Sequence, residues 1–277
     1  MREVSKEQFV EALRNLLVEV HYFLPEDVLE SIKEQYLKEQ NFVSRDVLNN
    51  ILLNAKVASS TKLPLCQDTG IPQIFLEIGR KVVFDFDLNE VVSSVVESVY
   101  NEEKLRRSGV IDPLIRKGSK HIYTFYTEIV EGESVKISVL IRGGGSENMS
   151  ATINFLPSSS ADEVKNVLVE KIVEMLPFTC APVIVGIGVG GSFEQSSFLA
   201  KKSLLRKIGE RNKVEFYSLL EDMIIQSVNV KGCGALGLGG GVSALDVFIE
   251  VAPTHIATLP VSVILQCHSV RRGSVRI

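Results

Sequence analysis

The chain has 277 residues and a net charge of −4, so no general basic field points to nucleic acid or to an anionic membrane surface. Hydrophobic residues make up 45% of it and charged residues 23%, which is typical of a globular protein. The chain begins without the apolar segment of a secretion signal, and residues 181–189 are too few and too interrupted by glycine to span a bilayer. We therefore expect a cytoplasmic protein.

The first part of the chain, over about residues 1–58, shows the periodicity of helices. Ser5 and Gln8 form a capping-box pattern before one apolar stripe, and Pro25 suits the first turn of a second helix. A third helix is predicted from Ser44 onwards. The apolar positions are Phe9, Leu13, Leu16, Leu17 and Val20, then Val28, Leu29, Ile32 and Tyr36, then Val47, Leu48, Ile51, Leu52 and Ala55. Such stripes are typical of helices that pack on a core.

After Cys66 the pattern changes from helical to strand-like. Residues 74–78 and 81–86 predict two short strands around Gly79, and the valines between residues 91 and 99 return to helical spacing. This change indicates that a sheet follows the N-terminal helices.

Two longer strand patterns predict an antiparallel hairpin. Residues 121–130 and 134–142 flank a turn at residues 131–133, and the second arm alternates apolar and polar residues as a half-buried strand does. The glycine-rich residues 143–146 that follow predict a loop with little side-chain bulk.

The C-terminal half predicts further helices and a last strand. The helices are expected over residues 160–177, 194–208 and 214–228, and the strand over residues 245–251. We predict an α/β (α+β) fold in one domain over residues 1–277. It would have a helical N-terminal region, then mixed sheets with flanking helices and loops that carry the cysteines.

Three of the four cysteines lie alone in loop-like segments. Cys66, Cys180 and Cys267 form no C-x-x-C pair, which argues against a zinc ribbon or a thioredoxin-type dithiol. Thiolates distant in sequence can still meet to hold an iron–sulfur cluster, and three of them would leave one iron open as a Lewis acid. Each cysteine taken alone would also suit a core position. Cys233, between two glycines, is expected to be structural.

Residues 186–191 match G-x-G-x-x-G, the pattern of dinucleotide-binding turns. A dinucleotide fold needs a second strand about 20 residues later that ends in an acidic residue, whereas residues 201–207 still have a helical pattern. A nicotinamide-dependent oxidoreductase therefore lacks its expected context. The turn could still offer backbone N–H groups to a carboxylate or phosphate.

Several segments give the chain a resemblance to a known family. They are residues 66–70 (Cys-Gln-Asp-Thr-Gly), residues 142–146 (Arg-Gly-Gly-Gly-Ser), residues 188–191 together with residues 199–201 (Leu-Ala-Lys), and Cys267 followed by Arg271 and Arg272. They resemble the class I, iron–sulfur-dependent fumarate hydratases and, equally, the α subunits of tartrate dehydratases. The resemblance covers nearly the whole chain.

The resemblance implies a ligand set and a reaction. Cys66, Cys180 and Cys267 correspond to the cysteines that bind a [4Fe–4S] cluster in that family, where the open iron binds the carboxylate and hydroxyl groups of a small dicarboxylate. The implied reaction is the reversible hydration of fumarate to malate, a step of the citric acid cycle. The alternative is the dehydration of tartrate to oxaloacetate; we expect fumarate.

The same resemblance assigns roles in substrate binding and proton transfer. A guanidinium pairs with a substrate carboxylate, backbone N–H groups hold the substrate, and a carboxylate and an imidazole handle protons. The corresponding residues are Arg106 (or its neighbour Arg107) for the guanidinium, Gly143, Gly144 and Gly145 for the backbone donors, Gln67 and Asp68 for contact with the substrate or the iron-bound water, and His255, reaching in from a neighbouring chain, for the imidazole. Taken alone, Asp68 would also suit a turn and His255 a core or surface position.

Single-chain members of the family continue into a second domain that carries the proton acceptor, which has no candidate here. We therefore expect an α subunit that acts with a separate β subunit, in a heterotetramer formed as a dimer of αβ. An alternative from another class is a non-catalytic Cys/His metal-binding assembly module around Cys66 and Cys267–His268. Arg271, Arg272 and Arg276 are expected to form a solvated tail or a docking place for a partner.

Overall fold

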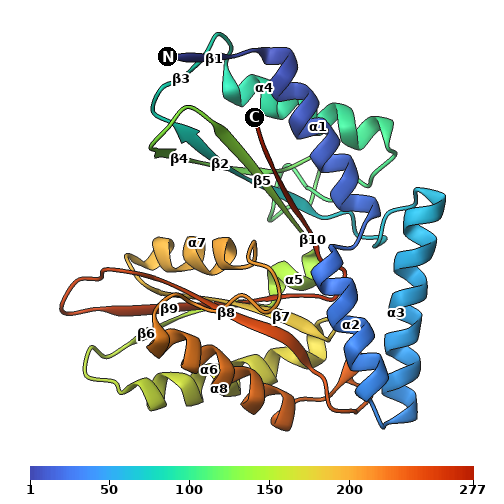
Figure 1. Cartoon of the computed structure of the whole chain (residues 1–277), viewed down its shortest axis with the longest axis vertical. Helices are drawn as coiled ribbons and strands as arrows, with labels where there is room; N and C mark the ends of the chain where they lie inside the picture. Colours follow the sequence, from blue (N-terminus) through green and yellow to red (C-terminus); the bar gives the residue numbers. More distant parts are fainter. The chain divides into compact units, whose positions relative to one another are not determined.

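The chain separates into two compact units in the computed structural model, which describes residues 1–277. The first unit consists of Met1–Pro25, Ala55–Gly143 and Arg271–Ile277, and the second of Glu26–Asn54 and Gly144–Val270. Each unit has its own mixed sheet and its own hydrophobic core (Figure 1). The predicted α/β class is confirmed, whereas a single domain over the whole chain stays a prediction.

The first unit is built on a four-stranded sheet in the order β10-β5-β2-β4. The strands are β2 (Ile71–Gly79), β4 (Thr124–Val130), β5 (Val135–Arg142) and β10 (Arg271–Arg276), and a separate small sheet pairs β1 (Arg2–Val4) with β3 (Val82–Phe84). β2 runs parallel to β4 and antiparallel to β5, which also pairs antiparallel with β10. Helices α1 (Lys6–Tyr22) and α4 (Leu88–Glu102) cover one face of the sheet (Figure 1).

The apolar stripe of α1 forms the core of the first unit together with the sheet. Leu13 and Leu17 of α1 are fully buried, as is Ile137 of β5. Burial of each such side chain stabilises the fold by about 1.5–3 kcal/mol, so the stripe holds α1 on the sheet. The helix begins as predicted, because the Ser5 hydroxyl accepts a hydrogen bond from Gln8 N over 3.2 Å.

The predicted hairpin between β4 and β5 is wrong. Both strands exist and run antiparallel, but β2 lies between them and pairs with each. β2 is buried along almost its whole length. A central position in the sheet pairs both of its edges, whereas an edge position would leave one of them exposed. The turn predicted at residues 131–133 meets the end of β2 instead, where Gly79 N donates to Ser134 O over 2.9 Å.

The second unit has a four-stranded sheet in the order β6-β9-β7-β8, in which β7 and β8 are parallel and the other pairs antiparallel. The strands are β6 (Ser150–Phe155), β7 (Val183–Gly190), β8 (Ala244–Ala252) and β9 (Leu259–Gln266). Helices α6 (Ala161–Met175) and α8 (Glu215–Lys231) pack on one face, and α7 (Phe193–Ser203) covers the other (Figure 1).

Helices α2 (Glu26–Lys38) and α3 (Phe42–Thr61) complete the predicted helical N-terminal region. Helix α3 begins two residues before Ser44, which instead bonds through its hydroxyl to the Glu39 carboxylate over 3.0 Å. The same carboxylate accepts from Gly241 N over 2.9 Å, and the Asp27 carboxylate accepts from Ile208 N over 2.8 Å. These bonds attach the helices to loops of the second unit.

Several elements near the predicted site differ from expectation. Residues 144–148 form the short helix α5 (Gly144–Asn148) where a loop is predicted, and β9 and β10 follow the strand that is predicted to be the last. β6 and β10 are short strands at the edges of their sheets. β10 is mostly polar, so it carries little hydrophobic signal, whereas β6 alternates polar residues with Ala151, Ile153 and Phe155 and was missed despite this pattern.

Gly186 and Gly188 of the G-x-G-x-x-G segment lie inside β7, where they let α7 pack directly on the strand. A Cβ atom at Gly186 would lie 2.3 Å from Ala200 O, and one at Gly188 would lie 1.9 Å from Ser196 O. The next strand begins only at Ala244, so the strand that a dinucleotide fold needs about 20 residues later is missing. These glycines serve helix–strand packing.

Helix α7 ends earlier than predicted, and an ionic network holds the segment that follows it. The buried carboxylate of Glu221 accepts from Arg206 over 2.8 Å and from two backbone N–H groups. Arg211 pairs over 2.8 Å with Asp246, which is also buried. Buried charges are tolerated when they are paired. These pairs, together with the backbone hydrogen bonds to Glu221, hold the chain between α7 and α8 in place.

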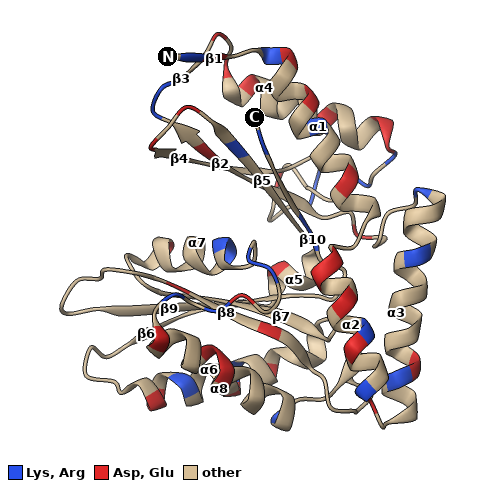
Figure 2. Cartoon of the chain, in the orientation of Figure 1, with Lys and Arg blue, Asp and Glu red and all other residues tan.

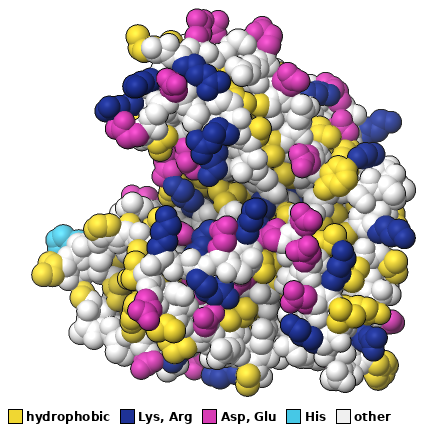
Figure 3. Space-filling view, in the orientation of Figure 1, with side chains coloured by type: hydrophobic (Ala, Val, Ile, Leu, Met, Phe, Trp, Pro, Cys, Tyr) yellow, Lys and Arg dark blue, Asp and Glu magenta, His cyan; other side chains and the backbone are white.

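One face of the chain carries a mixture of side-chain types. None of the helices combines the length and the apolar composition that a membrane span requires. On the face shown in Figure 3, basic and acidic side chains are interspersed and hydrophobic ones are scattered among them.

Candidate functional site

Cys66 lies half-buried in the segment that connects α3 to β2, in the first unit. The following residues form a turn, in which Asp68 Oδ1 accepts a hydrogen bond from Gly70 N over 3.0 Å and lies 3.4 Å from the Ser108 hydroxyl. An aspartate that bonds the backbone two residues on is a common turn former. The turn also holds the carboxylate in one place, as a catalytic group requires. Gln67 is exposed at the same turn.

Three buried side chains hold the backbone of this turn. Arg271 of β10, Tyr100 of α4 and His21 of α1 contact the consecutive carbonyl oxygens of residues 68–70 at 2.8–3.2 Å. Burial lowers the pKa of His21 to about 4 and raises the pKa of Tyr100, so both rings are neutral near pH 7. The neutral His21 ring has one N–H, and the Leu17 carbonyl oxygen lies nearer to it, 2.7 Å from Nδ1. The turn is therefore held by hydrogen bonds from α4 and β10 and is packed against the His21 ring of α1.

Arg106 and Arg107 take different positions in the first unit. Arg106 is exposed, and its carbonyl oxygen accepts a hydrogen bond from the Thr69 hydroxyl over 3.1 Å. The Arg107 guanidinium lies 3.2 Å from Asn101 Oδ1 and 3.3 Å from His121 Nε2. The structure thus ties the Arg106 segment to the same turn and engages Arg107 elsewhere.

Gly143 and Gly145 differ in how much room a side chain would have at each position. A Cβ atom at Gly143 would lie 2.8 Å from Asp68 Oδ2, whereas one at Gly145 would meet nothing within 4 Å. Gly144 begins α5 in the second unit. At Gly143 the missing side chain makes room for the Asp68 carboxylate.

His268 joins the loops that carry Cys180 and Cys267 in the second unit. Its backbone N donates to Cys180 O over 3.2 Å, and its Nδ1 lies 3.0 Å from the same oxygen. Burial lowers the pKa of the His268 ring, so the ring is neutral and Nδ1 carries the proton of this hydrogen bond. Cys267 N donates to the Ser146 hydroxyl over 3.3 Å. The two thiols therefore belong to loops in direct contact.

Polar side chains next to these thiols lack partners in the second unit. The amide of Gln266 is buried with neither Oε1 nor Nε2 hydrogen-bonded, and the Thr179 hydroxyl is in the same state. Such a group costs about 1–3 kcal/mol, which a bound group with acceptor atoms would offset. Thiolates with N–H and O–H donors beside them are the surroundings of iron–sulfur clusters. Cys180, Cys267 and their neighbours therefore fit a cluster.

The remaining predicted ligand belongs to another part of the chain. Cys66 lies in the first unit, whereas Cys180 and Cys267 lie in the second. No group of three or more His, Cys, Asp and Glu side chains in this structure could hold a metal ion. The structure thus brings the Cys180 and Cys267 loops together, and the role of Cys66 as a ligand stays a prediction.

β9 separates His255 from Cys267. His255 lies exposed in the loop between β8 and β9, where its Nδ1 accepts from Ala257 N over 3.1 Å, and Cys267 follows the other end of β9. The eight residues of β9 span about 26 Å at roughly 3.3 Å per residue. The His255 imidazole therefore does not reach the Cys180 and Cys267 loops of its own chain.

Comparison with known proteins adds the decisive observation. Residues 10–276 match the protein family described as fumarate hydratase (Fumerase). The chain belongs to this family. A putative L(+)-tartrate dehydratase subunit alpha from Methanocaldococcus jannaschii is 39% identical over 272 residues, which is 95% of each chain. The L(+)-tartrate dehydratase subunit alpha of Escherichia coli K12 is 27% identical over 286 residues, covering all of this chain and 94% of that relative.

Two arginines in this member of the fumarate hydratase family, Arg271 and Arg272, are not part of a solvated tail, so that alternative is wrong for them, while a docking place for a partner stays a prediction. Arg271 and Arg272 are 1% and 7% exposed and lie in β10, paired in register with Ile141 and Leu140 of β5. Arg276, at the end of the strand, is exposed; Figure 2 shows these basic residues in blue on β10. Their composition looks hydrophilic, but backbone pairing with β5 buries the start of the strand.

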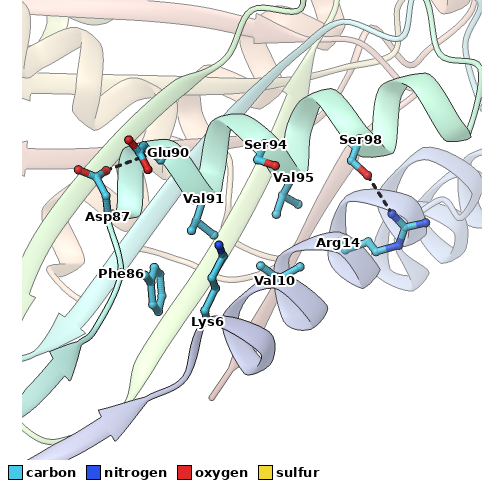
Figure 4. Close-up of a pocket in the computed structure, with 10 residues that line it drawn as sticks. All are labelled: Lys6, Val10, Arg14, Phe86, Asp87, Glu90, Val91, Ser94, Val95 and Ser98. Atoms are coloured by element: carbon cyan, nitrogen blue, oxygen red, sulfur yellow. Dashed lines mark hydrogen bonds between the residues drawn. The ribbon is translucent and has the colours of Figure 1, made fainter.

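A hollow of about 550 Å³ between α1 and α4 contains none of the predicted site residues. It is lined by valines and Phe86, with Lys6 and Arg14 of α1 on one side and Asp87 and Glu90, at the start of α4, on the other (Figure 4). The groups with family-related chemistry lie outside it.

The sequence did not predict that the side chains of His21, Tyr100 and Arg271 contact the turn at residues 68–70 in this member of the fumarate hydratase family. Arg271 had a signal, since it belongs to the pair of arginines after Cys267 that carries the resemblance. His21 and Tyr100 had none, because each stands at the end of an apolar helical stripe. Their contacts to the turn join residues far apart in the chain.

Proposed function

We propose that the chain is the α subunit of a [4Fe–4S]-dependent hydro-lyase that adds water reversibly across fumarate to give malate. Membership of the fumarate hydratase family supports hydro-lyase chemistry. The structural observation that supports a cluster is the contact between the Cys180 and Cys267 loops through His268. Thiolates distant in sequence on adjoining loops are what a cluster needs.

Cys66, Cys180 and Cys267 would hold the cluster. When bound, a cluster with three thiolate ligands supplies an iron with an open coordination position that acts as a Lewis acid. The Gln266 amide and the Thr179 hydroxyl are the donors available to its sulfur atoms, since both lack other partners.

The remaining residues of the chain would bind the substrate and move its protons. Arg106 would pair with one carboxylate, because a guanidinium forms two parallel hydrogen bonds with it. Gln67 and the backbone of residues 143–145 would hold the other oxygen atoms. Asp68, fixed by its turn, would hold the proton that is transferred when water adds.

His255 would act in a neighbouring copy of the chain. It is exposed and stands at the end of β9 remote from Cys267, so proton transfer by its imidazole requires a second copy. A dimer of αβ pairs would meet this requirement. The relatives are named as alpha subunits, which supports a separate β subunit that supplies the proton acceptor.

Tartrate is the second candidate substrate. Both relatives are named for tartrate dehydratase, and dehydration of tartrate to oxaloacetate uses the same groups, because tartrate and malate are four-carbon dicarboxylates that differ by one hydroxyl. The family description names fumarate, and the prediction from the sequence is the same.

Co-expression of the chain with its β subunit, purification without oxygen and reconstitution with iron and sulfide test the proposal. We expect about four iron atoms per α subunit and turnover of fumarate and malate. Cys66→Ser, Cys180→Ser and Cys267→Ser should each lose the cluster absorbance. Cys233→Ser is the matched control and should keep it.

Three other outcomes would contradict the proposal. A colourless protein that binds one zinc ion would indicate a metal-binding assembly module. A thermal shift with nicotinamide nucleotides would indicate an oxidoreductase. Turnover of tartrate but not of fumarate, measured side by side, would replace the first substrate by the second.

A further inference from the structure

Arg271 is a fully buried cation beside the candidate catalytic carboxylate. Its side chain is 1% exposed, its Nη1 donates to the carbonyl oxygen of Asp68 over 2.8 Å, and its Nε has no hydrogen-bond partner. Moving a guanidinium out of water costs several kcal/mol, and the Nε donor gains no hydrogen bond in return. Stability of the core alone therefore does not explain an arginine at this position.

The hydrogen bond from Arg271 completes a set of bonds around one turn. Gly70 N donates to Asp68 Oδ1 over 3.0 Å, while the Tyr100 hydroxyl donates to the carbonyl oxygens of residues 69 and 70 at 3.1 and 3.2 Å. Arg271 acts one residue earlier, on the backbone of Asp68 itself. Its removal would release the peptide that carries the carboxylate.

The Asp68 carboxylate and the Arg271 guanidinium meet at the same glycine. The position of a Cβ atom on Gly143 lies 2.8 Å from Asp68 Oδ2 and 3.6 Å from Arg271 Nη2. Gly143 directly follows β5, and β5 pairs with β10 so that Ile141 lies opposite Arg271. The register of β5 and β10 thus fixes the backbone position from which the Arg271 side chain extends. Gly143, which has no side chain, leaves space for the Asp68 carboxylate.

We propose that Arg271 is a positioning residue for the hydro-lyase reaction. It holds the backbone of Asp68 so that the carboxylate stays beside Gly143, ready to hold the transferred proton. This role rests on the proposed function of Asp68. Arg271 acts through Asp68 and does not touch the substrate, because its side chain is buried.

Arg271→Met and Arg271→Lys in the reconstituted αβ complex test the proposal, with Arg276→Met as the matched control on the same strand. A displaced catalytic group lowers turnover by about 100-fold, so we expect Arg271→Met to lower kcat by about this factor with KM close to wild type. Hydrogen exchange of residues 66–70 should become faster, while that of β2 and β5 should not. Arg271→Lys keeps a charge and a donor and should restore part of both. The exposed Arg276→Met should change neither.

A raised KM with unchanged kcat in Arg271→Met would overturn the proposal, because Arg271 would then be a substrate ligand. Wild-type exchange at residues 66–70 would overturn it as well. If Arg271→Met does not fold, Arg271→Lys is measured in the same way, and wild-type kcat and exchange in that variant count against the proposal. The exchange measurement is independent of the reaction. Faster exchange in a complex that turns over neither fumarate nor tartrate would reject the proposed function and retain the positioning role.

Discussion

The two units hold their cysteine-bearing segments in different ways. In the first unit, Arg271 and Tyr100 donate hydrogen bonds to the backbone carbonyls of residues 68–70, and the His21 ring packs against the carbonyl of residue 69. In the second, loop contacts hold the segments together, since His268 bonds to the carbonyl oxygen of Cys180. Side chains brought in from helices and a strand support one segment, and neighbouring loops support the other.

The two units also differ in how their buried charged side chains are paired. In the second unit, Glu221 and Asp246 are each paired with an arginine over 2.8 Å, as stability requires. In the first unit, Arg271 is buried with a backbone oxygen as its hydrogen-bond partner. Departures from local pairing rules are expected at functional sites, so the difference points to function in the first unit and to stability in the second.

Glu221→Ala should give the largest effect on stability. It leaves the backbone N–H groups of Asn212 and Ile249 without their acceptor and removes the buried carboxylate that pairs with Arg206. Breaking a buried pair costs about 3–5 kcal/mol, which denaturant unfolding would measure. Glu174→Gln, in an exposed pair, is the control and should cost less than about 1 kcal/mol. Equal effects of the two changes would mean that the network does not stabilise the second unit.

His21 should make the first unit sensitive to acid. Its pKa is lowered to about 4 by burial, from 6.5 in the unfolded chain, so the unfolded state binds more protons between these values. The stability is therefore fully present above about pH 6.5 and lost as the pH falls towards 4, by up to about 3 kcal/mol.

His21→Asn removes this titration and should flatten the dependence of the unfolding free energy on pH between 7 and 4.5. His121 and His268, whose pKa values are also lowered, remain in the variant and contribute to the slope that is left, as do Glu39, Glu102 and Glu194, whose pKa values are lowered too. An unchanged slope in His21→Asn would show that the ring does not titrate as burial implies.

Gly188→Ala should disturb the packing of α7 on β7. Its Cβ atom would lie 1.9 Å from the backbone oxygen of Ser196, which belongs to the helix and yields only if α7 moves. Overpacking of this kind costs about 1–3 kcal/mol. Gly241→Ala, where a Cβ atom would meet nothing within 4 Å, is the matched control. A thermal-unfolding midpoint that falls only in Gly188→Ala would support the packing role of the motif.

Two helix caps give the smallest effects and test the prediction of a single domain. The Ser5 hydroxyl caps α1 in the first unit and the Ser160 hydroxyl caps α6 in the second, each with one backbone N–H. Ser5→Ala and Ser160→Ala should each cost about 1 kcal/mol. In a single domain both variants shift the same unfolding transition. Two separate transitions, each moved by one variant, would reject that prediction.

Several elements followed from local patterns, and several did not. The capping serines and apolar stripes of α1 and α6 are local, so the sequence predicted where these helices begin. The insertion of β2 between β4 and β5 depends on which strand the whole unit can bury, and this choice has no local signature. The edge strands β6 and β10 depend on pairing with distant partners.

The sequence by itself determined the helical start, the α/β class and the family, because these follow from periodicity and from short segments of characteristic residues. The roles proposed for Cys66, Cys180, Cys267 and Asp68 rest on the same segments. Only the tertiary structure decided that Arg271 is buried under the Asp68 turn and that β9 separates His255 from Cys267. Such contacts join residues up to about two hundred positions apart. They arise from strand pairing and shared burial, which are properties of the folded chain.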